Sequence, residues 1–327
     1  MARGARRGHR RGDRGAGRRG AGRASGAGRP VSAVTIASTR AAIEAATTRL
    51  RDAGVDTARV DAEWLMAGLL GVGRAALAAN LDEELTPALA ARYDAAVTRR
   101  ERREPLQHIL GWEEFCGLRF TVTPDVLVPR PETEMLVEWT LSLLPRASAR
   151  RRLAIDVGTG SGCIACALAV ARTDVDVVAI DASPAAVEIA RRNVAGLGLS
   201  GRVTVREGDL LSGLGACRAD LVVANLPYLP APVLAGLAPE VVDHEPWVAL
   251  DGGPDGLSVI RSLVAQAPRW LAPGGALVLE TAGGDRIPET AGLMRAAGLS
   301  NISTRCDLVG IERFIAAFLP SIDDGRG

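Results

Sequence analysis

Residues 153–162 read Leu-Ala-Ile-Asp-Val-Gly-Thr-Gly-Ser-Gly, an apolar run that ends in three closely spaced glycines. The run predicts a buried strand, and the apolar residues 163–170 predict a helix directly after it. Glycines let the backbone turn tightly and approach a ligand, while the free N–H groups of a helix start can bind the polar parts of that ligand. The stretch therefore predicts a ligand site at the end of a strand in an α/β protein.

The spacing of these glycines disfavours a dinucleotide. A dinucleotide-binding fingerprint needs a glycine or alanine three residues after its second glycine. With Gly158 and Gly160 as the first two glycines, that position holds Cys163, and the third glycine comes one residue early, at Gly162. The turn therefore argues against NAD and leaves other adenosyl ligands open.

Two acidic residues follow the next two predicted strands. Asp181 comes directly after the run 175–180, and Asp209 comes shortly after the run 203–206. A carboxylate at the first position can accept both ribose hydroxyls of an adenosyl ligand, and the second lies where the adenine ring is expected. Because the carboxyl ends of parallel strands share one edge of a sheet, the glycine turn and both acids predict a single crevice.

The alternation of apolar runs and helical patterns predicts the fold class. Helices fit between the runs, for example at 184–196 and 257–271, and five runs read as strands: 153–157, 175–180, 203–206, 220–224 and 276–280. Continuous Val, Ile and Leu indicate strands covered on both faces, so we expect an α/β fold with a doubly wound, mostly parallel sheet. The runs 301–304 and 312–318 are too close for a crossover helix, which predicts an antiparallel hairpin at the edge of a seven-stranded sheet.

The fourth predicted strand ends in a polar turn, Asn225-Leu226-Pro227-Tyr228. The side-chain oxygen of Asn225 and a backbone carbonyl can accept both N–H bonds of a flat NH2 group, and Tyr228 can pack on its plane. An amide nitrogen is a poor nucleophile because its lone pair is delocalised, so aiming it at the atom that it attacks matters more than a strong base. Glu280, at the end of the fifth strand, could either line the crevice or be a solvated charge.

Helical periodicity predicts a small domain over residues 34–105. The expected inward faces of its first two helices are Ile43, Ala46 and Leu50, then Val60, Trp64 and Ala67. A third helix is expected to begin with Thr86 as N-cap and Pro87 in the first turn. Residues 106–134 form a predicted connector, which comprises a hairpin around 117–122 and a stiff loop over 128–134 with two prolines. We expect the main domain over 135–320 and a tail at 321–327.

The N-terminal segment differs in composition from the rest of the chain. Residues 1–30 hold ten arginines and one acidic residue, so we expect the Arg/Gly-rich segment 1–33 to be disordered, either as an RNA-binding arm or as an extension without function. Without residues 1–30, 29 arginines face 37 acidic residues, a net charge of about −8, which disfavours a general nucleic-acid surface. Five scattered cysteines and the lack of a long apolar run predict a cytoplasmic protein without a membrane partner.

Over residues 36–318 the chain resembles the bacterial HemK/PrmC family, the glutamine methyltransferases of peptide chain release factors. The stretches that carry the resemblance are 104–111 (Glu-Pro-Leu-Gln-His-Ile-Leu-Gly), 126–134, 156–162, 225–228, Glu245-Pro246, 251–253 (Asp-Gly-Gly) and 273–275 (Pro-Gly-Gly). The resemblance implies a class I, Rossmann-like methyltransferase fold and S-adenosylmethionine as cofactor. It also implies that the helical domain grips the release factor and that the glutamine of a Gly-Gly-Gln tip is the target.

The expected site follows from the residues and the resemblance together. The expected catalytic residues are Asn225, Leu226, Pro227 and Tyr228. The expected cofactor residues are Asp156, Gly158, Thr159, Gly160, Ser161, Gly162, Asp181, Asp209, Leu210 and Asn225. No metal site is expected.

The chain departs from the family pattern at Leu226, where the family usually has proline. The carbonyl of Leu226 is retained, and Pro227 still favours an extended conformation for the residue before it. The departure therefore bears on the substrate rather than on the reaction. The alternatives are the glutamine of a ribosomal protein and, since such a turn can also hold an exocyclic nitrogen, an amino group of adenine or guanine in RNA or DNA.

Overall fold

The computed structural model describes residues 38–145, 150–215, 217–234 and 236–321. The chain divides into two units, Met1–Ile36 and Ala37–Gly327, and every described residue belongs to the second. The predicted disorder of residues 1–33 and all but the first residue of the predicted tail, 321–327, lie outside the described residues.

The N-terminal part of the described chain is helical, as predicted. Its elements are α1 (Thr39–Asp52), α2 (Ala58–Leu70), α3 (Arg74–Leu77), η1 (Ala78–Asn80), α4 (Pro87–Glu101) and α5 (Leu106–Leu110). In α4, Thr86 is the N-cap and its hydroxyl accepts a hydrogen bond from the Leu89 amide at 3.2 Å, which confirms the predicted start. Among the described residues no single helix is long and apolar enough to cross a membrane, and α2 with Arg74–Asn80 meets those criteria only as a pair bent by 88°.

The inward face of α1 is the predicted one, whereas that of α2 agrees with the prediction only at Ala67. Ile43 and Leu50 are fully buried. In α2, Val60 is 36% exposed, and the buried residues are Ala58, Asp61, Ala62, Leu65, Met66 and Ala67. A charged residue, Asp61, lies on the buried face because it pairs with Arg100, and this interrupts the apolar period that the prediction followed.

The connector contains the predicted hairpin but ends earlier than expected. Strands β1 (Trp112–Phe115) and β2 (Leu118–Thr121) pair antiparallel around a turn at residues 116–117. The predicted stiff loop over 128–134 was wrong beyond Arg130, because Pro131 takes the first position of helix α6 (Pro131–Leu143). Proline suits that position, since its fixed φ is helical and its missing N–H has no partner there.

A seven-stranded sheet follows, in the order β5-β4-β3-β6-β7-β9-β8. The strands are β3 (Arg152–Val157), β4 (Val175–Asp181), β5 (Val203–Glu207), β6 (Ala219–Asn225), β7 (Leu271–Glu280), β8 (Ser300–Cys306) and β9 (Glu312–Phe318). The strands from β5 to β7 are parallel, and β9 lies antiparallel between β7 and β8. The prediction of a mostly parallel sheet with an antiparallel hairpin at its edge is confirmed.

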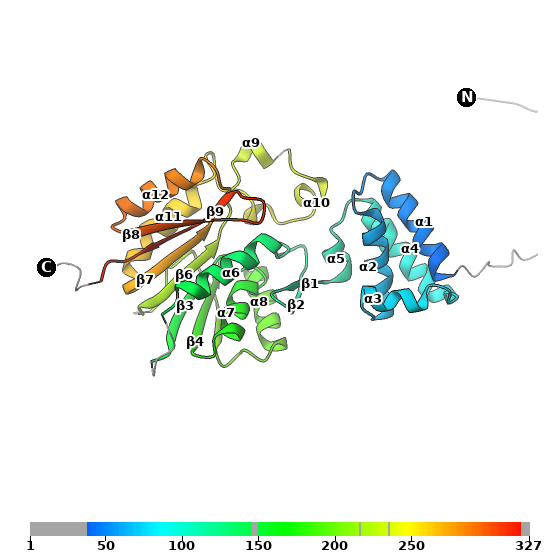
Figure 1. Cartoon of the computed structure of the whole chain (residues 1–327), viewed down its shortest axis with the longest axis horizontal. Coiled ribbons are helices and arrows are strands. Elements are labelled where there is room, and N and C mark those ends of the chain that lie inside the picture. Colours follow the sequence, from blue (N-terminus) through cyan, green and yellow to red (C-terminus); the bar gives the residue numbers. More distant parts are fainter. Residues whose placement is uncertain (1–37, 146–149, 216, 235, 322–327) are drawn as a thin grey trace, which may run out of the picture. The chain divides into compact units, whose positions relative to one another are not determined.

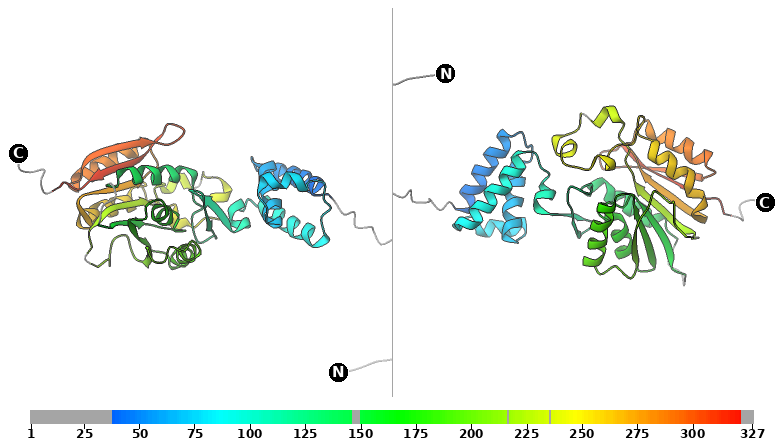
Figure 2. Two further views of the ribbon diagram at one scale, coloured as in Figure 1. Left: turned by 60° about the horizontal axis from the view of Figure 1, so that its bottom comes forward. Right: turned by 180° about the vertical axis from the view of Figure 1, so that it is seen from behind.

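Helices cover both faces of this sheet (Figure 1). Figure 1 shows α6, α7 (Cys163–Ala171) and α8 (Pro184–Gly196) on one face, with α11 (Ser258–Gln266) and α12 (Arg286–Ala296) on the other. The back view in Figure 2 shows the same division. The helix predicted over 257–271 is shorter than expected, because the 3-10 turn η3 (Ala267–Arg269) contains a proline and β7 begins at Leu271.

The core has two layers, one on each face of the sheet. In β6, Leu221 and Val223 join the cluster under α6 and α7, while Val222 and Ala224 join the cluster under α11 and α12. Strands β3 and β6 are neighbours, but the chain leaves them in opposite directions across the sheet. From β3 it goes to β4 on one side, and from β6 it goes to β7 on the other. A crevice outside the carboxyl ends of two such strands is the usual ligand position in a doubly wound sheet.

Candidate active site

The turn after β3 is held open by three glycines with left-handed backbone conformations. Gly158, Gly160 and Gly162 have φ angles of 71°, 55° and 82°. The amides of Gly158 and Thr159 both donate to the carbonyl of Ile180, at 2.8 and 2.9 Å, which ties the turn to the end of β4. Residues with a side chain rarely adopt such φ values, so glycine is required for this path.

Asp156 fastens the turn from below and does not line the cavity. Its side chain is fully buried, and its Oδ2 accepts hydrogen bonds from the Thr159 hydroxyl at 2.5 Å and from the Ala165 amide at 3.1 Å. Burial raises the pKa of this carboxyl group to about 7. The structure therefore gives Asp156 a supporting position under the turn instead of the ligand contact that we expected.

Asp181 ends β4 with its carboxylate beside the glycine turn. Its Oδ2 accepts from the Gly160 amide at 2.8 Å, and its Oδ1 accepts from the Ser183 amide at 2.9 Å. Burial raises the pKa of this carboxyl group. Because each carboxylate oxygen can accept two hydrogen bonds, both oxygens keep one acceptor position for a pair of ligand hydroxyls.

The turn after β5 brings Asp209 and Leu210 to the same crevice. The Gly208 amide donates to the Asp181 carbonyl at 2.9 Å, so this turn is fixed directly to the end of β4. Leu210 has a φ of 52°, an unusual value for a residue with a side chain. The two turns and Asp181 thus form one continuous wall, as predicted from the order of the strands.

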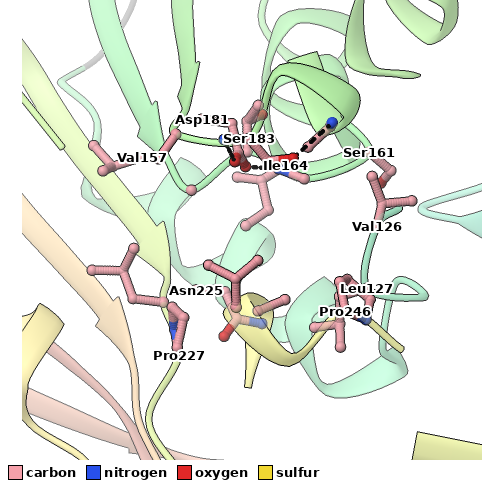
Figure 3. Close-up of a pocket in the computed structure, with 18 of the residues that line it drawn as sticks. Val126, Leu127, Val157, Ser161, Ile164, Asp181, Ser183, Asn225, Pro227 and Pro246 are labelled. Carbon is pink, nitrogen blue, oxygen red and sulfur yellow. Dashed lines mark hydrogen bonds between the residues drawn. The ribbon is translucent and has the colours of Figure 1, made fainter. Parts of the chain in front are cut away.

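These strand ends enclose a cavity of about 510 Å³. Ten predicted residues line it: Gly158, Thr159, Gly160, Ser161, Asp181, Asp209, Leu210, Asn225, Leu226 and Pro227. Figure 3 shows Asp181 and Ser183 on one side of the cavity and Asn225 with Pro227 on the opposite side. Of the other predicted residues, Gly162 does not line it either: it is the N-cap of α7, and a Cβ there would lie 3.3 Å from Ala190 of α8.

Asn225 is carried to the cavity by the register of the sheet. Parallel pairing sets Ala224 beside Val157, so the residue after each, Asn225 and Gly158, also lie close together. A Cβ at Gly158 would lie 3.9 Å from the Asn225 carbonyl and 2.9 Å from Cδ2 of Leu226. The side chain of Leu226, only 4% exposed, therefore packs directly against the glycine turn.

Two polar residues behind Asn225 were not predicted as site residues. The Asn225 Nδ2 group donates to the Thr133 hydroxyl at 3.0 Å, and that hydroxyl donates to Oε2 of Glu280 at 2.8 Å. Thr133 and Glu280 are 3% and 2% exposed, so Glu280 is not the solvated strand-end charge that the sequence left open. Burial raises the pKa of Glu280 to about 7. The sequence held one indication of this position, because Glu280 ends the strand after the one that ends in Asn225. In the parallel pair β6–β7 the two residues lie opposite each other.

Tyr228 takes a different position from the one predicted. It does not line the cavity, and its hydroxyl donates to Oε1 of Glu280 at 3.4 Å. Burial and the nearby Glu280 carboxylate raise the pKa of this phenol. The Tyr228 hydroxyl is thus directed toward Glu280, which the sequence did not link to it, and the packing of the ring on the plane of a substrate group stays a prediction.

The opposite wall of the cavity comes from the connector and from the segment after β6. The connector contributes residues 125–127, Pro129 and Arg130, and the later segment contributes Pro246, Val248 and Ala249. Figure 3 shows Leu127 beside Pro246. Arg130 forms an ion pair with Glu245 at 2.5 Å, which joins these two segments. Two of the stretches that carry the family resemblance, 126–134 and 245–246, thus meet at this wall.

The described residues fit an adenosyl ligand. The cavity volume lies within the range of about 300–1,000 Å³ that is usual for such sites. Gly160 has open space where a side chain would stand, and Asp181 faces the cavity with unused acceptor positions. Among the residues that the structure describes, no group of three His, Cys, Asp or Glu side chains could hold a metal ion. The size of the cavity and the free acceptor positions of Asp181 point to an organic cofactor.

Comparison with known proteins shows which families and solved structures this chain is similar to. A family model described as the PrmC N-terminal domain matches residues 41–111, and the model of the methyltransferase small domain matches residues 133–234. The release factor glutamine methyltransferase of Geobacter sulfurreducens is 44% identical, over 81% of this chain and 91% of the relative. That of Mycolicibacterium smegmatis is 43% identical, over 85% of this chain and 96% of the relative. The solved hMettl16 catalytic domain in complex with MAT2A 3'UTR hairpin 6 has a TM-score of 0.51 at 17% identity, over 73% of this chain and 84% of that one, and shares the fold.

Proposed function

This chain belongs to the release factor glutamine methyltransferase family, and from that premise we propose that it methylates the side-chain amide nitrogen of a glutamine in a peptide chain release factor. It is a methyltransferase, and its cofactor is S-adenosylmethionine. When bound, S-adenosylmethionine supplies a methyl group on a positively charged sulfur. The observation that supports the proposal most strongly is Asn225 beside the glycine turn in one cavity.

The cofactor-binding residues have separate roles in this proposal. Asp181 accepts the two ribose hydroxyls, because both of its oxygens keep an acceptor position beside their backbone hydrogen bonds. Gly158 and Gly160 let the backbone approach the ligand closely. Asp209 and Leu210 border the position of the adenine ring. Asp156 fixes the turn through Thr159 and does not touch the ligand.

The substrate amide is held by acceptors alone. Oδ1 of Asn225 and the backbone carbonyl of Leu226 each accept a hydrogen bond from one of the two N–H groups of the glutamine amide. This arrangement fixes the plane of the amide and aims its nitrogen at the methyl group, which compensates for the weak nucleophilicity of an amide. No strong base is required, because an N–H proton becomes acidic only after the methyl group has been transferred.

The proposed target is the glutamine of the Gly-Gly-Gln tip of a release factor. The helical segment expected over residues 34–105 is the proposed surface that grips the factor, and the connector 106–134 leads from it to the cavity. We place the reaction in the cytoplasm, where translation occurs. The net charge of about −8 outside residues 1–30 disfavours RNA as the main substrate.

The test is to incubate the protein with labelled S-adenosylmethionine and either a release factor or RNA. We expect one methyl group on the tryptic peptide that contains the Gly-Gly-Gln glutamine, detected by mass spectrometry. Asn225→Ala should lower the rate at least about 100-fold, since it removes one positioned acceptor. Asn301→Gly, at an exposed residue of β8 outside both the cavity and the helical domain, is the control and should retain the rate, since glycine suits the φ of 51° at this position. Label confined to RNA, or an Asn225→Ala variant with normal activity, contradicts the proposal.

A further inference from the structure

Asn225 can accept a hydrogen bond from the substrate only in one of the two orientations of its side-chain amide. Its Oδ1 must face the substrate, and its Nδ2 group must face the protein, because the substrate amide offers two N–H donors. The two ends of an asparagine amide have nearly the same shape, so packing alone does not select between them. The selection has to come from the hydrogen-bonding partners of the amide.

Thr133 is the partner on the protein side. Its hydroxyl carries a single proton, and that proton is donated to Oε2 of Glu280 at 2.8 Å. The oxygen of Thr133 can then only accept, and it accepts from Nδ2 of Asn225 at 3.0 Å. If the amide were turned round, Oδ1 would face the Thr133 oxygen with no proton between them.

We propose that Thr133, with its proton committed to the Glu280 carboxylate, is the positioning residue that keeps Oδ1 of Asn225 facing the substrate. This inference rests on the proposed function, since it assumes that the substrate group is a donor. Thr133 acts through Asn225, and Glu280 acts through Thr133. Asn225 and Thr133 are 92 residues apart in the sequence, and Thr133 and Glu280 are 147 apart, so only the folded chain builds this arrangement.

The charge of Glu280 decides whether the arrangement holds. An ionised carboxylate can only accept, so the Thr133 proton must point toward it. A protonated Glu280 can donate to Thr133 instead, which frees the Thr133 proton to bind Oδ1 of a reversed Asn225 amide. The protonated enzyme therefore no longer distinguishes the two orientations, and the fraction of productive Asn225 falls.

The surroundings of Glu280 set the pH at which its carboxyl group takes up a proton. Glu280 accepts hydrogen bonds from Tyr228, in the turn after β6, and from Thr133, in α6. The charged groups that face it are Arg313 on β9 and Glu132 on α6. Burial, the largest influence, raises the pKa of Glu280 to about 7, while Thr133 and Arg313 lower it. Activity should therefore fall as the pH drops below about 7.

The kinetic test compares three substitutions in helix α6. Thr133→Val removes the hydroxyl and keeps the shape, so kcat/KM for the release factor should fall about 10-fold to 100-fold, while the dissociation constant of S-adenosylmethionine changes less than about threefold. Thr133→Ser keeps a hydroxyl and should restore most of the rate. Thr140→Val is the matched control, because Thr140 lies in the same helix, is fully buried, and has a hydroxyl without a hydrogen-bond partner among the described residues.

Glu280→Gln tests the dependence on charge. A neutral side chain cannot hold the Thr133 proton as a carboxylate does, so kcat/KM should be low at pH 8 and the loss of activity toward pH 6 should disappear. If Glu280→Gln loses activity toward pH 6 in the same way as the wild-type protein, the inference is wrong. Equal activity of Thr133→Val and Thr133→Ser overturns it as well.

A spectroscopic test does not depend on turnover. The chain has only four asparagines, Asn80, Asn193, Asn225 and Asn301, so selective 15N labelling gives four side-chain NH2 signals. The Asn225 signal, identified by its loss in Asn225→Asp, should shift with a midpoint near pH 7 and should move in Thr133→Val. A signal insensitive to both changes refutes the inference even if the enzyme is active. A wild-type protein that shows the shifts but methylates no release factor refutes only the proposed function.

Discussion

Leu226 and Gly158 fit each other at the scale of single residues. Leu226 stands where the family usually has proline, and its Cδ2 atom would lie 2.9 Å from a Cβ at Gly158. Such a distance is too short for two carbon atoms, so a side chain at 158 would force the end of the Leu226 side chain to move. Gly158 also has a φ of 71°, which by itself favours glycine. Two independent constraints therefore act on one position of the cofactor turn.

We expect Gly158→Ala to raise the dissociation constant of S-adenosylmethionine at least about tenfold, which corresponds to about 1.4 kcal/mol. The reason is that the new methyl group must displace Leu226 or the turn. Isothermal titration calorimetry measures the effect. Gly198→Ala is the matched control, because its φ is 70° but nothing lies within 4 Å of the new Cβ, so affinity should be unchanged.

A double-mutant cycle separates the contact from the backbone effect. In a Leu226→Ala background the clash is absent, so Gly158→Ala should weaken cofactor binding less than it does in the wild-type background. Equal effects in the two backgrounds would show that the φ angle alone demands glycine, and that Leu226 adds nothing.

At the scale of elements, a buried ion pair joins two helices of the N-terminal domain. Asp61 of α2 accepts from Nε of Arg100 in α4 at 2.7 Å, and their side chains are only 6% and 7% exposed. Arg100 also pairs with Glu240 of α10 (Pro239–Val242) at 2.9 Å, as does Arg103 at 2.7 Å. The helical domain is thereby connected to the segment after β6, which also supplies part of the cavity wall.

Asp61→Ala should lower the free energy of unfolding by about 3 kcal/mol, because it leaves the buried Arg100 guanidinium with one carboxylate fewer. Urea denaturation followed by circular dichroism measures the change. Glu63→Ala in the same helix is the comparison: its partners Arg59 and Arg74 are 45% and 44% exposed, so that loss should stay below about 1 kcal/mol. Equal losses in the two variants would contradict the assignment of Asp61 as a buried anchor.

At the scale of the whole molecule, the sheet places buried carboxyl groups under the cavity at a cost that depends on pH. Asp156 lies under the glycine turn and Glu280 lies behind Asn225, and burial raises the pKa of both to about 7. The unfolded chain releases these protons at the lower, ordinary pKa of a carboxyl group. Between the two pKa values the folded state binds more protons, so the contribution of each group to stability falls as the pH rises.

Asp156→Asn should therefore gain stability relative to the wild-type protein as the pH rises. The relative gain between pH 5 and pH 8 should be about 2 to 3 kcal/mol, most of it complete by pH 7, since an amide has no proton to release. Urea denaturation at pH 5, 6, 7 and 8 gives the difference between the two proteins at each pH. A difference that does not change with pH would mean that the pKa of Asp156 is not raised.

The sequence by itself determined the strands of the sheet and the polar residues at or just after their carboxyl ends. Continuous apolar runs with glycine turns predicted the parallel strands, and the rule that their carboxyl ends share one edge brought Asp181, Asp209 and Asn225 to one crevice. Local patterns suffice here because each of these residues ends a strand, or follows one within two residues, and each strand is visible as an apolar run along the chain. The start of α4 was equally local, since Thr86 and Pro87 form its N-terminal cap.

Only the tertiary structure decided which side chains support those residues. Thr133 and Glu280 reach Asn225 because α6 packs on the sheet and β7 lies beside β6, and no local pattern contains that lateral arrangement. The inward turn of Asp61 and the turn of Tyr228 toward Glu280 have the same cause, a buried polar partner distant in the sequence. A buried polar group must find a hydrogen-bonding partner, and which partner it finds is a property of the packed chain.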